Sequence, residues 1–427
     1  MLVYPALRAS SAFGALASGF CQTYVFARVL NPELFSIYIL IASLGVSLWL
    51  FDLGIAKVLF VRLRDAFLNG RLEDEDGDNL PTQATGIALL YAALVALGTL
   101  ACFLMVAAGT ARGPLEASQE ALLFAYTALN IVWFILRNVS VAGDQFIFFE
   151  SLDVVRRFAH IGLIFCLFLP MSFIAFALWS NLLWALLFVV LVTRLSRLGL
   201  LRWDTGRLVS SSVAFFRLHR SALWSSGRYA LGEMYIYTFP SLLVPALHGL
   251  GPPTIIFDTV FKVFRGATIA FAAACDLLVP RQTRAFAAGD TADLRRCTLV
   301  ALVLSSIPGV GLCGLLTLFG DRLFGLLLGN AAQVPTAFVL VLIVLILANL
   351  VQTVSNFVLV HTGFFRPIGR LATGMAALMT AVAILDALLE LDLFGFLLLY
   401  AAAYVMGAIL YVVLAMRYPL AGVRPQG

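Results

Sequence analysis

The chain has 427 residues, 62% of them hydrophobic and only 12% charged, and its 28 Lys and Arg against 23 Asp and Glu give a net charge of +5. Globular domains are about 45–50% apolar and about 25% charged, so a soluble fold could not keep this much apolar surface from water. A 12% share of aromatic residues also excludes a disordered chain. The composition predicts an all-α, polytopic membrane protein.

Motifs typical of enzymes, metal sites and cofactor sites do not occur in the sequence. Neither lysine follows a glycine, so there is no P-loop, and GxSxG and HExxH are missing. The six cysteines are scattered without a CxxC pair or a His cluster, which argues against disulfides and metal ligation. In a membrane protein the basic excess indicates loops at an anionic cytoplasmic leaflet, and not a nucleic-acid partner. We expect a protein that is not an enzyme and has no cofactor.

Twelve stretches are long and apolar enough to cross a membrane, which takes about 20 residues. They are 9–29, 34–60, 84–108, 119–141, 154–170, 173–193, 221–246, 256–279, 298–319, 334–360, 371–389 and 394–416. The 36 residues between Arg157 and Arg194 carry no Asp, Glu, Lys or Arg and would form a single helix of about 54 Å. Pro170 and Ser172 predict a turn that divides this stretch into two crossings.

The distribution of basic residues predicts the orientation of the chain. With the N-terminus in the cytoplasm, 21 Arg and Lys fall on the cytoplasmic side, Arg137, Arg156 and Arg157 among them, and three fall outside. An even number of spans then places the C-terminus in the cytoplasm as well. The remaining four basic residues fall within spans: Lys57, Arg228, Lys262 and Arg265.

The longest polar stretch, residues 194–220, divides the chain into two lobes of six spans, 1–193 and 221–427. Its arginines alternate with Trp203, Phe215 and Phe216, a pattern typical of an amphipathic segment on the cytoplasmic membrane surface. A simple tether between the lobes is the alternative. The acidic run at 73–78 predicts a solvated loop.

The two lobes carry a weak internal repeat. VRLRDAFLNGRLED (61–74) and PRQTRAFAAGDTAD (280–293) match at a constant offset of 219 residues, which pairs Arg62 with Arg281 and Phe67 with Phe286. Both segments follow an even-numbered span, so the repeats are parallel in topology. This predicts two six-helix lobes related by a pseudo-twofold axis along the membrane normal, as in many transporters.

Four charged residues form one stripe on the span at 257–280. Asp258, Lys262, Arg265 and Asp276 follow one another at intervals of 4, 3 and 11 residues, which places them within about 40° on a helix. Such a stripe cannot face lipid and must line a wet cavity or pair with another helix.

The preceding span adds Arg228 and Glu233. We predict that Arg228, Lys262 and Arg265, with Asp258 and Glu233 beside them, bind an anionic group such as a diphosphate, because guanidinium groups bind phosphate oxygens through two parallel hydrogen bonds. The alternative is an internal salt-bridge network in which the two carboxylates neutralise the cations.

The repeat also aligns Lys57 with Asp276 near the cytoplasmic ends of equivalent spans. Opposite charges there predict a gate between the lobes, and the alternative is that each residue only reaches the cytoplasmic interface. Asp52 in FDLG is predicted to cap a helix, and Asn349 to hold helices together.

Three further expectations concern other polar residues. Asp386 and Glu390 are predicted to lie on a frayed, wet helix end. The four histidines indicate no metal site, and a proton-carrying role for one of them stays open. The first span has a polar or small-residue face that cannot contact lipid, formed by Ser11, Ala15, Ser18 and Gln22.

Several segments together resemble a known family. ARVLNPELFSIYILIASLGVSLWLFDLG (27–54), LVPRQTRAFAAGDTADLRR (278–296), LLLGN (326–330) and HTGFFRPIGR (361–370) are similar, in order and spacing, to segments of the polysaccharide-biosynthesis or lipid-linked oligosaccharide flippases of the multidrug/oligosaccharidyl-lipid/polysaccharide (MOP) exporter superfamily. One departure is that the first span has basic residues only at its ends, Arg8 and Arg28.

The resemblance implies a MATE/MOP-like fold of twelve helices with a cavity lined by spans one, two, seven and eight. It implies a flippase in the bacterial inner membrane that moves undecaprenyl-diphosphate-linked oligosaccharides by alternating access, for surface polysaccharide. Its partners would be that lipid-linked sugar, membrane lipids, and a polysaccharide polymerase with chain-length proteins. The alternatives are a cation-coupled multidrug exporter of the same fold, a polytopic glycosyltransferase or polymerase, and a scaffold of the assembly machinery.

Overall fold

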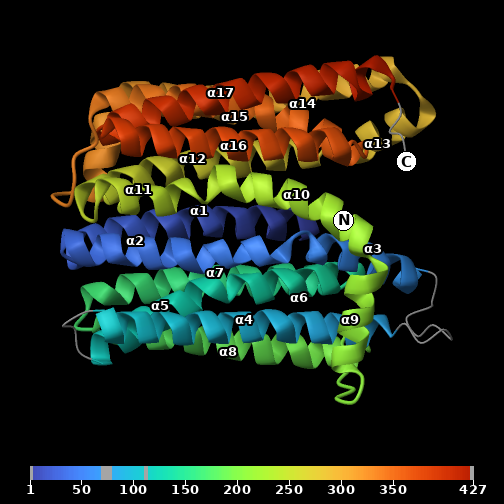
Figure 1. The fold of residues 1–427 in the computed structure, drawn as a ribbon, viewed down its shortest axis with the longest axis horizontal. Coiled ribbons are helices and arrows are strands. Elements are labelled where there is room, and N and C mark those ends of the chain that lie inside the picture. Colours follow the sequence, from blue (N-terminus) through green and yellow to red (C-terminus); the bar gives the residue numbers. More distant parts are fainter. Residues whose placement is uncertain (1–2, 69–78, 110–113, 424–427) are drawn as a thin grey trace. The chain divides into compact units, whose positions relative to one another are not determined.

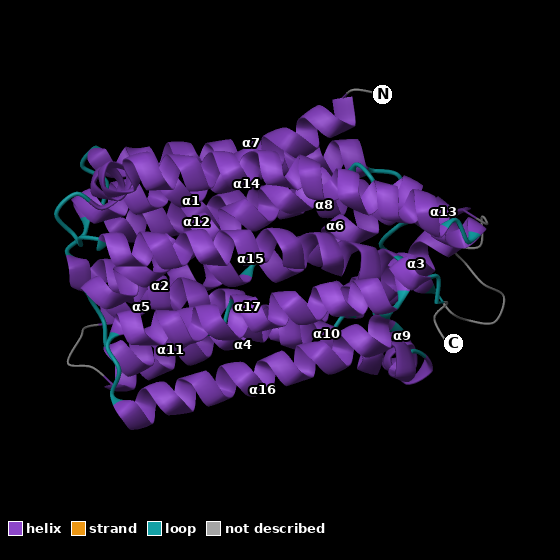
Figure 2. Ribbon diagram, turned by 90° about the horizontal axis from the view of Figure 1, so that it is seen from above, coloured by secondary structure: helices purple, strands orange, loops and turns teal. Residues whose placement is uncertain are grey.

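The computed structural model describes residues 3–68, 79–109 and 114–423, and these form helices joined by turns, without a β-strand (Figures 1 and 2). The predicted acidic loop at 73–78 lies outside the described residues. The chain divides into two compact units. The first combines Met1–Val29 with Ile37–Ala230, and the second combines Leu30–Ser36 with Leu231–Gly427.

The helices follow the chain in the order of the predicted spans. Up to the connector they are α1 (Val3–Val29), α2 (Pro32–Ser47), η1 (Leu48–Asp52), α3 (Ile55–Leu68), α4 (Leu80–Gly109), α5 (Pro114–Ala128), α6 (Asn130–Ala142), α7 (Phe146–Phe165), η2 (Cys166–Phe168), α8 (Phe173–Arg197) and α9 (Leu208–Leu218). After it come α10 (Arg220–Tyr237), α11 (Pro240–His248), α12 (Pro252–Asp276), α13 (Val279–Ala288), α14 (Thr291–Leu328), α15 (Thr336–His361), α16 (Phe365–Leu389), α17 (Leu393–Arg417) and η3 (Pro419–Ala421).

Each of the twelve predicted spans coincides with one helix or with consecutive helices separated by short breaks. Seven helices in the described ranges are long and apolar enough to cross a membrane on their own, and an eighth span results if the bent pair of α12 and α13 is taken together. The other spans are broken or carry polar side chains. The chain is a multi-pass membrane protein.

The predicted turn between the fifth and sixth spans is confirmed. η2 ends at Phe168, and α8 begins at Phe173. Ser172 is the N-cap residue of α8, and its hydroxyl accepts a hydrogen bond from the backbone N–H of Ala175 at 3.3 Å. This bond satisfies one of the donors that every helix N-terminus leaves without a partner.

The predicted cap at Asp52 is also confirmed. Leu53 and Gly54 adopt positive φ angles of 43° and 77°, which breaks the second span between η1 and α3. The buried Asp52 carboxylate accepts the backbone N–H groups of Gly54 and Ala56 at 3.1 and 3.0 Å and the Tyr91 hydroxyl at 3.0 Å. The FDLG motif therefore ends one helix and starts the next.

The connector packs on the first unit. α9 lies across one end of α4 (Figure 1), and a Cβ atom on Gly86 of α4 would overlap the Ser212 hydroxyl of α9. Thr85 on α4 also accepts a hydrogen bond from the backbone N–H of Arg202 at 3.0 Å. Glycine at position 86 therefore permits the close approach of α9 to α4.

A buried amide holds the second unit together, as predicted for Asn349. This side chain on α15 donates to Thr268 of α12 at 2.6 Å and accepts from Thr353 of its own helix and Tyr404 of α17 at 3.0 and 3.2 Å. The bonds tie three helices to one point. An amide is favourable in an apolar interior only when its bonds are made in this way.

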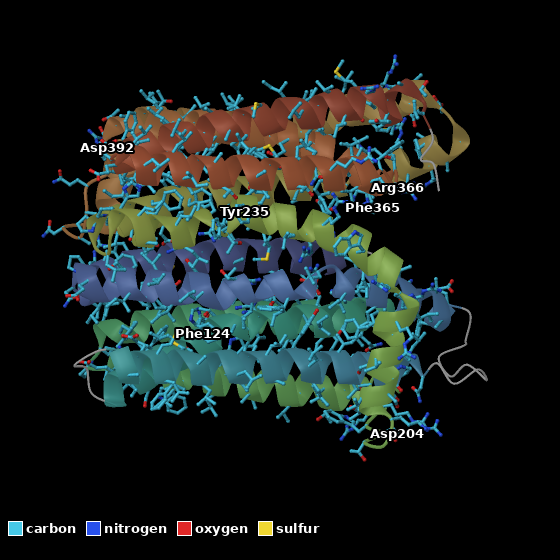
Figure 3. All side chains as sticks on the ribbon, viewed as in Figure 1. Phe124, Asp204, Tyr235, Phe365, Arg366 and Asp392 are labelled. Atoms are coloured by element: carbon cyan, nitrogen blue, oxygen red, sulfur yellow. The ribbon has the colours of Figure 1, made fainter. Side chains whose placement is uncertain are left out.

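The two ends of the second unit carry different charges. Arg366 at the start of α16 and Asp392 at the start of α17 lie at opposite ends (Figure 3). The expectation of a frayed, wet helix end is wrong for Asp386. Its side chain is buried and lies 3.0 Å from the ring of His248, a partner on the distant helix α11 that hydropathy could not reveal.

Candidate functional site

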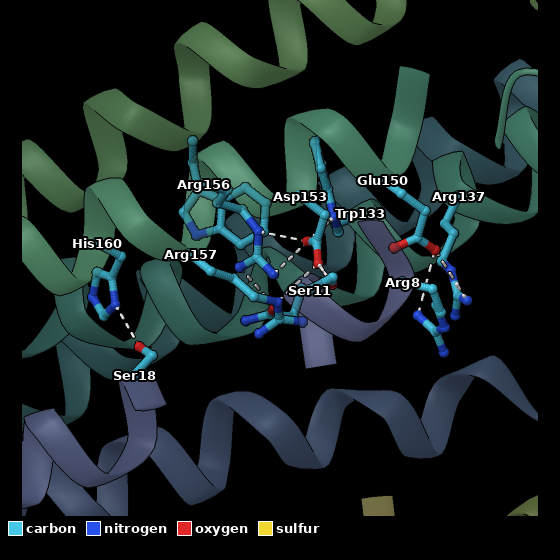
Figure 4. Close-up of polar contacts among 12 residues, drawn as sticks. Arg8, Ser11, Ser18, Trp133, Arg137, Glu150, Asp153, Arg156, Arg157 and His160 are labelled. Carbon is cyan, nitrogen blue, oxygen red and sulfur yellow. Dashed lines mark hydrogen bonds and ion pairs between the residues drawn. The ribbon is translucent and has the colours of Figure 1, made fainter. Parts of the chain in front are cut away.

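Five ionisable side chains follow one another along α7 in the first unit. They are Glu150, Asp153, Arg156, Arg157 and His160, and their spacing places most of them on one side of the helix (Figure 4). Contacts of this group reach α1 and α6.

Asp153 is the centre of this cluster. Its two oxygens accept hydrogen bonds from Ser11 of α1 at 2.5 Å, from the indole of Trp133 at 2.9 Å and from the side chains of Arg156 and Arg157 at 2.7 to 3.0 Å. The Asp153 side chain is buried. A buried carboxylate with this many donors is satisfied, and it fixes the direction of both guanidinium groups.

The two neighbouring arginines differ in accessibility. The Arg156 guanidinium carbon lies 4.5 Å from the ring centroid of Trp184 and 5.6 Å from that of Trp133, and 9% of the side chain is exposed. Arg157 makes one ion pair with Asp153, at 2.8 Å, and keeps 27% of its side chain exposed. Arg156 is therefore a fixed buried charge, whereas Arg157 has N–H groups to offer a ligand.

Glu150 forms a second pairing point one turn before Asp153. Arg8 of α1 and Arg137 of α6 approach the same Glu150 oxygen at 3.4 and 3.6 Å. The Glu150 side chain is buried, while the Arg8 side chain is 44% exposed. Two long ion pairs therefore share this one carboxylate.

The far end of the cluster contacts α1 and α5. His160 forms a hydrogen bond through Nδ1 with Ser18 at 3.1 Å, and its ring stacks on Tyr126 with the centroids 4.7 Å apart. Ser11 and Ser18 of the predicted polar face of α1 thus contact α7, and Gln22 of that face bonds Tyr38. Three of the four residues predicted for this face therefore bond to other helices, as expected for a face that does not contact lipid.

Counting charges shows what the cluster can do. With Arg137 left out of the count, Arg8, Arg156 and Arg157 share two buried carboxylates, an excess of one positive charge among these described residues. Buried charges without full compensation are costly in an apolar interior. An anionic group bound beside these arginines would offset the excess.

The predictions for Arg156 and Arg157 need correction. The sequence counts both on the cytoplasmic side, at the beginning of the span predicted at 154–170. α7 begins at Phe146, and Arg156 is a buried residue of its interior. A prediction from hydropathy ends a span at charged residues, so it cannot recognise charges that are buried inside a helix bundle. The signal that could have found the site is the regular helical spacing of charges in FESLDVVRRFAH.

The predicted stripe on α12 is only partly assembled. The Lys262 ammonium lies 2.6 Å from one Asp258 oxygen, and the Arg265 guanidinium lies 3.6 Å from the other. Arg265 also lies over the ring of Phe261 at 5.6 Å. This trio carries one net positive charge, and its internal pairs are those of the salt-bridge alternative. Asp276 is exposed at the last position of the helix, 11 residues beyond Arg265.

The remaining predicted site residues belong to separate places. Arg228 is exposed on α10 in the first unit, whereas the α12 trio belongs to the second unit. Glu233 is in α10, and its side chain lies outside the described residues. Lys57, in the first unit, has its ammonium 4.9 Å from the ring centroid of Tyr229. The joint anion site of α10 and α12 and the gate between Lys57 and Asp276 stay predictions.

No protein-family model and no curated protein matches this sequence. Solved structures do match it. A multidrug resistance MATE family transporter of the MOP superfamily, in an inward-facing conformation, is 14% identical over 98% of both chains with a TM-score of 0.63. The Vibrio cholerae MATE transporter VcmN, in its bent form, is 14% identical over 99% of this chain and 100% of its own, with a TM-score of 0.60.

A third similar structure differs in the character of its pocket. It is a MOP superfamily transporter from Pyrococcus furiosus, reported with a binding pocket of reverse polarity that suggests a different function. It is 12% identical over 99% of this chain and 94% of its own, with a TM-score of 0.57. These likenesses establish the fold. Over its described residues the chain has the all-α fold of MATE transporters of the MOP superfamily, a fold of twelve membrane helices in two lobes.

Proposed function

We propose that this protein is an alternating-access transporter that flips an undecaprenyl-diphosphate-linked oligosaccharide across the bacterial inner membrane. The observation that carries the proposal is the excess of arginine over carboxylate around α7 in the first unit. A diphosphate linkage is the part of such a substrate that every sugar variant shares. The diphosphate carries negative charge, which would offset the positive charge of this cluster.

Arg157 and Arg8 are the groups best placed to receive the diphosphate. Both are partly exposed, and each guanidinium keeps N–H donors beyond those used on Asp153 or Glu150. Guanidinium forks match phosphate oxygens in geometry, and such charge-assisted bonds are stronger than neutral ones. Arg156, enclosed by two indole rings, adds a fixed positive charge behind them.

The same cluster argues against the multidrug alternative. A cationic drug needs a carboxylate that is free to pair with it. The carboxylates of α1 and α7 in the described ranges are Glu150 and Asp153, and both are already paired with arginines. The fold alone suits either substrate, and the pairing of these two carboxylates supports the anionic one in this proposal. The neighbouring structures are transporters, which favours transport over a glycosyltransferase, a polymerase or a scaffold.

α10 and the second unit supply further parts of the proposed path. Arg228, Lys262 and Arg265 would form a second anion site, with Asp258 and Glu233 as their neighbours, in the conformation that brings α10 and α12 to the substrate. Lys57 and Asp276 would close the cytoplasmic side. Reversing both charges should then restore a transport defect caused by reversing either charge alone, and the absence of such rescue would remove the gate from the proposal.

The charge distribution supports the proposed orientation with both termini in the cytoplasm. In the second unit the end that holds the start of α16 and the end of α17 is rich in arginine, and the opposite end holds most of the acidic residues. Basic residues concentrate on the cytoplasmic side of membrane proteins. The inner membrane is the place where a polyprenyl-linked sugar must cross.

Binding by the purified protein tests the substrate class. The probes are farnesyl diphosphate, farnesol and the cationic dye ethidium. We expect farnesyl diphosphate to bind, and Arg157→Ala to weaken it by about tenfold or more, the value of losing a charge-assisted hydrogen bond. Arg157→Lys should bind with intermediate affinity.

Arg207→Ala is the matched control, because its side chain is 71% exposed and lies in the connector. It should bind farnesyl diphosphate like the wild type. Preference for ethidium, or an Arg157→Ala variant with wild-type affinity for the diphosphate, would overturn the proposal.

A further inference from the structure

The connector, residues 194–220, carries positive charge that the first unit does not neutralise. It holds six arginines and one acidic residue, Asp204. Asp204 lies 3.8 Å from Arg207, so it forms only a long ion pair. Arg197 and Arg217 are exposed, and within the described part of the chain neither has an ion-pair partner. Both guanidinium groups therefore keep their N–H donors for a group outside the chain.

Large apolar side chains are exposed beside these arginines. α9 carries Val209, Val213 and Arg217 at intervals of four residues, so these side chains lie along one side of the helix. Val209 is 77% exposed, and Trp203 before α9 is 53% exposed. The Trp203 indole donates to the Ser196 hydroxyl of α8 at 3.1 Å, which holds the ring beside the end of α8. Apolar and basic groups thus occur together on the exposed side of the connector.

The opposite side of the connector fixes its position on the first unit. Phe215 and His219 are buried on the side of α9 that faces away from Val213. Leu200 and Leu201 are buried before it, and a Cβ atom on Gly143 would overlap the Leu200 side chain. α9 runs across the end of α4 and not along it (Figure 1). A helix that crosses the end of a membrane span lies at the level of the lipid headgroups.

A layer of anionic phospholipid matches both parts of this exposed side. Lipid phosphates accept hydrogen bonds from guanidinium groups, and anionic headgroups attract basic segments that lie beside membrane spans. The boundary between headgroups and acyl chains accommodates apolar side chains, and tryptophan is enriched there. An acidic, hydrophilic segment of another protein would match only the arginines.

We propose that the connector surface, formed by Arg197, Trp203, Val209, Val213 and Arg217, binds anionic phospholipids in preference to zwitterionic ones. The two arginines pair with the anionic headgroups, and the three apolar side chains enter the boundary below them. Each arginine near such a surface raises the preference by about fivefold. Lipid binding at this surface does not depend on the transported substrate.

Quenching of Trp203 fluorescence by brominated phospholipids tests the proposal on the purified full-length chain. Nanodiscs of phosphatidylcholine receive equal amounts of brominated phosphatidylglycerol or brominated phosphatidylcholine. The difference between the wild type and Trp203→Phe gives the contribution of Trp203. We expect the brominated phosphatidylglycerol to quench Trp203 about fivefold more strongly or better, and high salt to reduce this preference because it screens the charges.

Arg197→Gln combined with Arg217→Gln should make the two brominated lipids quench Trp203 nearly equally. The matched control is Arg28→Gln combined with Arg322→Gln, which removes the same number of charges at exposed positions outside the connector. This control should keep the wild-type preference for phosphatidylglycerol.

Equal quenching of wild-type Trp203 by the two lipids would overturn the proposal, and so would an unchanged preference in the connector variant. Absence of quenching by either lipid would also overturn it, and would favour a connector that is a tether in water or is covered by a protein. If the connector variant fails to fold, the salt dependence of the wild type decides, because a preference that persists in high salt is not electrostatic. If the wild type moves no lipid-linked sugar, the proposed function fails while the quenching still reports on lipid binding.

Discussion

Removing the Asp153 carboxylate should cost more stability than removing any exposed charge of this protein. In the folded state Asp153 accepts hydrogen bonds from Ser11, Trp133, Arg156 and Arg157. Asp153→Ala leaves the buried Arg156 guanidinium without its counter-charge, and breaking a buried pair in this way costs about 3–5 kcal/mol. Whole domains are stable by about 5–15 kcal/mol. The variant should therefore lose a large part of its stability.

The assay is reversible unfolding of the reconstituted chain by denaturant, with the wild type and Asp153→Ala compared under the same conditions. Replacing both partners should lower the free energy of unfolding much less, because no unpaired charge is then left in the interior. Asp153→Ala with Arg156→Leu is therefore expected to regain most of the lost stability, and the double-mutant cycle gives the coupling. A loss below about 1 kcal/mol for Asp153→Ala, the size typical of an exposed pair, would refute the reasoning.

Three other substitutions test the packing and polar contacts that position the site. Gly45→Ala would place a Cβ atom against the Thr127 hydroxyl, with too little room for it, and we expect a loss of about 1–3 kcal/mol in the same unfolding assay; wild-type stability would contradict the close approach of α2 and α5. Asp52→Ala removes the cap of α3, so the amide hydrogens of Gly54 and Ala56 should exchange faster, and unchanged protection would count against the cap. Asn349→Ala removes the acceptor of the Thr353 and Tyr404 hydroxyls and the donor to Thr268, and it should cost about 1–3 kcal/mol, with a lower thermal midpoint as the readout and an unchanged midpoint as the contrary result.

Local residue chemistry predicted much of the fold. Pro170 and Ser172 marked a turn that no hydropathy minimum marks, because both residues act through their own backbone and hydroxyl groups. Asp52 before Leu-Gly indicated a cap for the same reason. Asn349 in an apolar span had to make its hydrogen bonds with other helices, since lipid offers none. In each case the residue type alone restricts what its surroundings can be.

The candidate site in the first unit could not be predicted from residue type alone. An arginine that is neutralised by a buried aspartate and one in a solvated loop have the same hydropathy, and only their partners distinguish them. The partners of Asp153 come from three helices, and His248 is far from Asp386 in sequence. Contacts of this kind depend on tertiary packing. The α12 stripe was visible because its members share one helix.

The positive charge around α7 can be compared with the pockets of the similar solved structures. MATE structures share the fold with this chain at an identity of 14%, so nothing in the scaffold fixes the charge of its interior. The Pyrococcus furiosus transporter, reported with a pocket of reverse polarity, indicates that the fold accommodates different pocket charges. Function in this fold therefore has to be argued from the site and not from the scaffold.

Movement of a fluorescent polyprenyl-diphosphate oligosaccharide across proteoliposomes that contain only this protein tests the central claim most directly. Inward-facing and outward-facing substrate are distinguished by a membrane-impermeant quencher. We predict translocation by the wild type, a marked loss in Arg157→Ala, and wild-type rates in Arg207→Ala. Absence of translocation by the purified wild type, together with export of cationic dyes from the same vesicles, would contradict the account.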